Sequence, residues 1–118
     1  MPDEPEALPG KAISGIQFLA KALAKNDWET LEGMGACSRV SVEDLQRVLH
    51  ENAIGLAEHP ESAWPKCMDI YPTVYPGLWL VDLALWGSEG ETDLTLQLSV
   101  SCSAGSVFSL TINDLRVL

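Results

Sequence analysis

The first part of the chain shows a helical repeat of apolar residues. Ile13, Ile16, Ala20 and Leu23 are separated by three or four positions, which places them on one side of an α-helix. Polar residues fill most positions between them, including lysines in the last turn, where the helix dipole favours positive charge. The pattern predicts an amphipathic helix over residues 11–25.

Two further helix starts follow, each marked by a side chain that can accept a backbone N–H. Asp27 can cap a short second helix, which Gly33 and Gly35 would end. Ser41 is followed by acidic residues, a combination that stabilises the positive end of a helix. Apolar residues continue with helical spacing beyond it, so we expect this helix to reach about Ala57.

The repeat changes to two residues in the second half of the chain. Residues 94–102 alternate between apolar and polar side chains, which is typical of a strand with one face on a core. Residues 108–112 repeat the pattern after a turn over residues 103–106. Residues 78–86 are apolar at both parities except at Asp82, which predicts a strand that is central in the sheet or covered on both faces.

The order of these elements indicates the fold class. A weaker apolar segment over residues 67–75 adds a strand that its prolines would restrict to an edge, and residues 58–66 are expected to form a connecting loop. Helices followed by strands indicate an α+β fold, with two N-terminal helices packed on one face of a three- to four-stranded antiparallel meander. We expect a single domain over residues 11–118, preceded by a disordered acidic tail over residues 1–10.

Charge narrows the classes of partner. The 118 residues include 17 acids and 7 bases, for a net charge of −10. This field repels nucleic-acid phosphates and anionic lipids and attracts basic partners, so we expect no nucleic acid and no membrane. The charge is also uneven, because residues 67–115 contain six acids and no lysine or arginine. An acidic half of this kind favours a docking surface for a basic protein.

Candidate chemistry is sparse. The chain has no nucleophile, metal or phosphate-binding motif, and His50 and His59 have no third metal ligand at a suitable spacing. Cys37, Cys67 and Cys102 are odd in number and widely separated, which predicts free thiols rather than disulfides or a zinc site. We therefore expect no enzyme activity, no cofactor and no metal. The acidic, proline-rich first ten residues are unlike a signal peptide, so a cytoplasmic location is expected.

Acids and tryptophans of the strand region are the candidates for contact with a partner. Asp82 is the one charge in an apolar strand, and the hairpin loop that follows adds three more acids. Trp79 and Trp86 have opposite parity, so a regular strand places them on opposite faces of the sheet. The predicted partner-binding residues are Trp79, Asp82, Trp86, Glu89, Glu91 and Asp93.

The segment from Trp79 to Leu98, WLVDLALWGSEGETDLTLQL, resembles the signature of a family of short uncharacterised bacterial proteins. The shared pattern is Leu-Trp-x-x-Glu-Gly-x-x-Asp-Leu-Thr-Leu with an Asp-Leu-x-Val-Leu ending. Here it falls on Leu85, Trp86, Glu89, Gly90, Asp93, Leu94, Thr95 and Leu96, and on Asp114, Leu115, Val117 and Leu118. The resemblance implies a bacterial setting without an activity. The element order also resembles cystatin-like or ketosteroid-isomerase-like cones, although the pocket Asp, His and Tyr set of such enzymes is missing.

The sequence is consistent with two functions. The first is a non-catalytic protein-binding module, most concretely an immunity-type protein that neutralises a basic bacterial toxin by electrostatic docking. The alternative is a small-molecule-binding or hydrolytic cone-fold domain with a pocket between helices and sheet, in which Asp82 would act. A homodimer with packed sheet faces is a third interpretation of the outward tryptophan.

Overall fold

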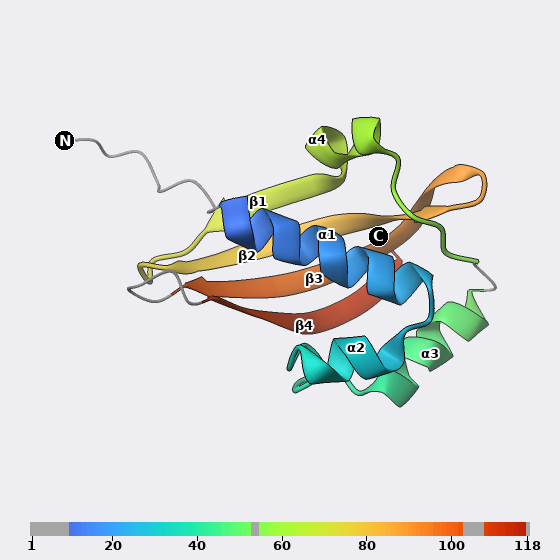
Figure 1. Ribbon diagram of the computed structural model, residues 1–118, viewed down its shortest axis with the longest axis horizontal. Coiled ribbons are helices and arrows are strands. Elements are labelled where there is room, and N and C mark those ends of the chain that lie inside the picture. The colour runs from blue at the N-terminus through green and yellow to red at the C-terminus, as the bar shows by residue number, and fades with distance from the viewer. Residues whose placement is uncertain (1–9, 53–54, 103–107, 118) are drawn as a thin grey trace.

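The computed structural model describes residues 10–52, 55–102 and 108–117 (Figure 1). Helices occupy the first half of the chain and an antiparallel sheet the second, so the α+β prediction is confirmed. The predicted turn over residues 103–106 lies outside the described residues. The predicted tail does too, apart from Gly10, which begins the first helix.

The helical half of the described chain begins with α1 (Gly10–Ala24), α2 (Trp28–Gly33) and α3 (Val42–Glu51). The starts of α2 and α3 follow the capping residues found in the sequence. The Asp27 side chain accepts the N–H of Thr30 at 3.3 Å, and the Ser41 hydroxyl accepts the N–H of Asp44 at 3.2 Å. Each bond satisfies a donor that has no partner within the helix, which fixes where the helix begins.

The expected end of the third helix near Ala57 is wrong, because α3 ends at Glu51. The backbone beyond it bonds to the sheet instead. Leu56 forms an isolated antiparallel bridge with Gly87, and the Ala57 N–H donates to the Trp86 carbonyl at 2.8 Å. Leu56 packs against the core from this extended segment, so its helical spacing was misleading.

The expected loop over residues 58–66 contains short helical turns. A 3₁₀ turn, η1 (Glu61–Ala63), leads directly into α4 (Trp64–Cys67), and the Ala63 N–H donates to the Pro60 carbonyl at 2.9 Å. The turns bury Trp64, which is 8% exposed. The buried Trp64 side chain therefore anchors this connection to the core, although its prolines indicated a loop.

The sheet contains four strands in the order of the sequence: β1 (Met68–Pro72), β2 (Leu78–Gly87), β3 (Gly90–Cys102) and β4 (Phe108–Val117). All neighbouring strands are antiparallel, which makes the sheet a meander. The weak segment of the sequence is the edge strand β1, as predicted, and the apolar segment is the central strand β2. The prediction that this segment is central or covered on both faces is therefore met by its central position, although one face is partly open, since Leu80 is 42% exposed.

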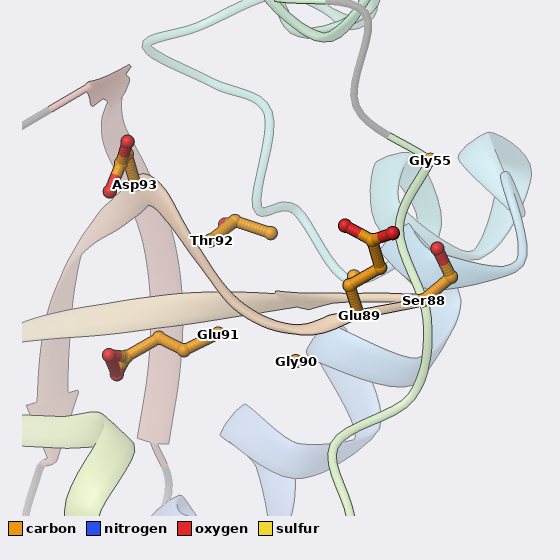
Figure 2. A pocket seen from close by; sticks show the side chains of 8 residues that line it. Gly55, Ser88, Glu89, Gly90, Glu91, Thr92 and Asp93 are labelled. Atoms are coloured by element: carbon orange, nitrogen blue, oxygen red, sulfur yellow. The ribbon is translucent and has the colours of Figure 1, made fainter.

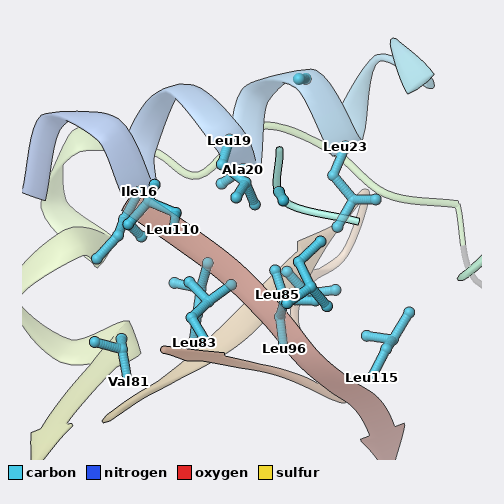
Figure 3. Packing of buried hydrophobic residues seen from close by; sticks show 14 of the residues in the cluster. Ile16, Leu19, Ala20, Leu23, Val81, Leu83, Leu85, Leu96, Leu110 and Leu115 are labelled. Carbon is cyan, nitrogen blue, oxygen red and sulfur yellow. The ribbon is translucent and has the colours of Figure 1, made fainter. Parts of the chain in front are cut away.

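The core lies between α1 and one face of the sheet (Figure 3). Ile16, Leu19 and Leu23 project from α1 towards the leucines of the strands. On the sheet side the buried residues include Val81, Leu83, Leu85, Leu94, Leu96, Leu98, Val100, Leu110, Ile112 and Leu115. We call this the inner face of the sheet, and the opposite face the outer face.

The loop between α2 and α3 closes the sheet at β4. The Ile112 N–H of this edge strand donates to the Ala36 carbonyl at 2.9 Å. Arg39 donates to the Asn113 side chain at 2.9 Å, and that side chain donates in turn to the Ser99 hydroxyl at 2.7 Å. The backbone groups at the outer edge of β4 are therefore partly hydrogen-bonded to the loop between α2 and α3.

Candidate functional site

Alternation along β2 separates the two tryptophans that the sequence offered as partner contacts. Trp79 lies on the inner face with Val81 and Leu83 and is 4% exposed. Trp86 has the opposite parity and is half-buried, so the predicted separation of the two side chains is confirmed. Burial against the core leaves Trp79 unable to contact a partner at the surface, and it drops out of the candidate site.

Asp82 lies on the outer face, where it is half-buried. Its neighbours across the two adjoining strands are Asp69 of β1 and Gln97 of β3. A carboxyl in this position points away from α1 and cannot line a pocket between the helices and the sheet. Its direct neighbour Asp69 was not singled out from the sequence, because only the strand register brings the two acids together.

Two carboxylates directly opposite each other on a sheet repel and reduce stability. Asp69 is exposed, and among the described residues no lysine, arginine or histidine forms an ion pair with either acid. Asp114, on β4, differs because Arg116 lies 3.8 Å from it. Negative charge is therefore uncompensated in the β1–β2 half of the outer face and partly neutralised in the β3–β4 half.

Tyr71 lies close enough to this acidic pair for the two charges to affect its pKa. It lies on the outer face opposite Leu80 and next but one to Asp69. Desolvation raises the pKa of the Tyr71 phenol above its ordinary value, and the charges of Asp69 and Asp82 raise it further. The same face exposes apolar surface, since Tyr71 and Leu80 are 46% and 42% exposed. The β1–β2 half of the outer face thus combines acids with apolar and aromatic side chains.

Trp86 is fixed by a contact that the sequence did not reveal. The His59 ring stacks on Trp64 with centroids 4.3 Å apart and lies 5.7 Å from Trp86 at a tilt. Its Nε2 lies 2.7 Å from the Ala84 carbonyl, so this nitrogen carries the proton and donates. His59 therefore joins the segment before α4 to the edge of β2 and partly covers Trp86.

The acidic hairpin between β2 and β3 borders a shallow pocket of about 340 Å³, lined by residues 87–93 and Gly55. The side chains of Glu89, Glu91 and Asp93 extend in different directions around it (Figure 2). Within the described ranges, no group of three His, Cys, Asp or Glu side chains could hold a metal ion. The hairpin thus presents separate exposed carboxylates rather than a converging ligand set.

No disulfide joins Cys37, Cys67 and Cys102 in the described part of the chain, as predicted. Burial raises the pKa of Cys67 to about 11, with a smaller raising effect of Glu91, and burial followed by Glu32 raises the pKa of Cys37. Thiols with raised pKa values are protonated near neutral pH and are poor nucleophiles.

A comparison with models of protein families assigns this chain to a family. Residues 20–118 match the model of a domain of unknown function, DUF7668, so the chain belongs to that family. No curated protein and no solved structure matches the chain. The cone-like resemblance and the quoted signature therefore stay predictions. None of the helices in the described part of the chain has the length and apolar character needed to span a membrane.

Proposed function

We propose that this DUF7668 domain is a non-catalytic protein-binding module that neutralises a basic protein, most concretely a bacterial toxin, in the manner of an immunity protein. The observation that carries the proposal is the Asp69–Asp82 pair across β1 and β2. The two acids destabilise the isolated sheet, and a positively charged partner would relieve their repulsion.

The surroundings of the pair suit a protein partner. Tyr71 and Leu80 offer exposed apolar area beside the charges, and protein interfaces commonly combine an apolar centre with a polar rim. The exposed hairpin acids Glu89, Glu91 and Asp93 add negative charge at the far end of β2, where the half-buried Trp86 adds aromatic surface. Long-range attraction to such a surface accelerates association and weakens as ionic strength rises.

Pull-down from a bacterial lysate at low salt, followed by elution with a salt gradient, tests the proposal. We expect a basic protein to elute at moderate salt, and expression of that protein alone to arrest growth unless this domain is co-expressed. The double variant Asp69→Asn/Asp82→Asn should release the partner at lower salt, with about tenfold weaker binding.

A charge-matched control separates a local surface from net charge. Glu29→Gln/Glu43→Gln removes two exposed carboxylates from α2 and α3 and should elute like the unmodified protein. Equal loss of binding in both double variants would show that only net charge matters. A captured protein that has no effect on growth would contradict the neutralising role.

A further inference from the structure

β1 is an edge strand that is exposed along most of its length. It is the first strand in the sheet order and pairs only with β2 (Figure 1). Asp69, Ile70, Tyr71 and Pro72 are all exposed, although Ile70 has the parity of the inner face. An exposed edge strand presents backbone groups that another extended chain can pair with.

Hydrogen bonds at the edge of β2 fix the direction of its backbone. The Trp86 carbonyl accepts the Ala57 N–H, and the Ala84 carbonyl lies 2.7 Å from His59 Nε2. Both partners come from the side of β2 opposite β3. Even-numbered residues of β2 therefore direct their backbone groups towards the side on which β1 lies.

The register of β1 against β2 shows which β1 residues direct their backbone groups towards β2 and which direct them away. Asp82 and Leu80 are even-numbered, so their partners Asp69 and Tyr71 direct their backbone groups inwards to β2. The N–H and carbonyl of Ile70 consequently point to the free edge. Pro72, two residues on, offers only a carbonyl there, which limits pairing to a short strand centred on Ile70.

We propose that β1 accepts an extended basic segment of the partner as a fifth strand of the sheet, in register with Ile70. The inference rests on the proposed function and assigns the surface through which it operates. A residue opposite Ile70 would be apolar, since Ile70 lies on the inner face. Its two neighbours would face Asp69 and Tyr71, where lysine or arginine gains an ion pair and a cation–π contact.

Charge favours a basic partner strand at β1 over a second copy of this chain or its own first nine residues. A second copy paired through β1 would bring two Asp69–Asp82 pairs onto one continuous outer face, and each copy carries a net charge of −10. The first nine residues of the chain contain three acids, three prolines and no lysine or arginine, which suits them poorly to an acidic strand edge. A basic strand meets neither obstacle.

The probe for the test is a capped seven-residue peptide with alternating lysine and valine. Amide hydrogen exchange, followed by NMR, should slow at least tenfold at the Ile70 N–H when the peptide saturates the protein. The same peptide with glutamate in place of lysine should have no effect. Ile70→Lys should weaken binding of the basic peptide at least tenfold, whereas Val74→Lys, which adds the same charge to a loop residue that is 89% exposed, should change it less than about twofold.

Three outcomes would overturn the proposal. Binding of the basic peptide without slower exchange at Ile70 would exclude strand addition while leaving an electrostatic docking function in place. Absence of binding would exclude it as well, and the pull-down would then decide the docking function independently. Concentration-dependent protection of Ile70 in the protein alone would assign the edge to a second copy.

Discussion

The two edges of the sheet are finished in different ways. At β4, a loop from the helical half accepts the Ile112 N–H, and Arg39 bonds to Asn113. At the other side, Ala57 and His59 bond to the part of β2 that extends beyond β1. β1 itself has exposed residues from Asp69 to Pro72.

The difference determines which edge of the sheet can pair with another chain. Covering an edge removes it from pairing with any chain, whereas a short strand with a proline and acids resists only some partners. Asp69 and Asp82 discourage a second copy of an acidic protein but attract a basic segment. The covered edges therefore contribute to stability, and the β1 edge is where function is expected.

The largest expected effect comes from the turn that positions the open edge. Gly77 has a φ of 78°, and a Cβ there would collide with the carbonyl oxygen of Cys102, whose N–H donates to the Gly77 carbonyl at 2.8 Å. Gly77→Ala should lower the free energy of unfolding by about 2–4 kcal/mol, measured by urea denaturation. Gly33→Ala, where a Cβ meets open space, should change it by less than about 1 kcal/mol. Similar losses for both variants would contradict this account of the turn.

The covered edge of β2 should depend on His59. His59→Ala removes the bond to the Ala84 carbonyl and the ring contacts with Trp64 and Trp86, so we expect a loss of about 1–3 kcal/mol in the free energy of unfolding. His50→Ala, at an exposed position of α3, should lie within about 0.5 kcal/mol of the unmodified protein. Thermal or urea unfolding of the two variants checks the difference, and an equal response would show that His59 does not hold this edge.

The covered edge of β4 should show a smaller effect. Arg39→Ala removes an exposed hydrogen bond to Asn113, so a loss of about 0.5–1 kcal/mol is expected. Exchange at the Ile112 amide should also become faster, because the loop that accepts this N–H loses one of its attachments. Arg47→Ala, which removes exposed ion pairs on α3, should leave Ile112 unchanged. Faster exchange in both variants would indicate general destabilisation rather than local opening.

The smallest effect concerns the titration of Tyr71 on the open edge. The pKa of Tyr71 is raised in the folded protein, by desolvation first and then by Asp69 and Asp82. The folded state therefore holds this proton more tightly than the unfolded state, and the free energy of unfolding should fall as pH rises above about 10. Tyr71→Phe should reduce that slope, and Asp69→Asn should shift the phenolate absorbance of Tyr71 to lower pH. An unchanged titration in Asp69→Asn would place the acid too far away to act.

The sequence predicted the elements whose signal is local. The caps at Asp27 and Ser41 and the alternation of β3 determine structure through neighbours in the chain, and all three were identified correctly. Residues 55–57 were misassigned because their hydrogen-bond partner is Trp86, about thirty residues away, rather than the preceding helical turn. A short-range pattern cannot report that competition.

The candidate site shows the same limit. Parity alone separated Trp79 from Trp86, and Asp82 was noticed as a charge in an apolar strand. The pairing of Asp82 with Asp69 requires the register of β1 against β2, which depends on the conformation of the turn at Gly77. The exposure of Ile70 likewise follows from the tertiary arrangement and has no sequence signature.

Amide hydrogen exchange of the free protein tests the contrast between the edges most directly. The Ile70 N–H, on the open edge of β1, should exchange at least tenfold faster than the Ile112 N–H, which donates to the Ala36 carbonyl. This result would leave β1 available for a basic segment. Equal and strong protection of both amides in the monomer would show that the β1 edge is closed, and would contradict the account.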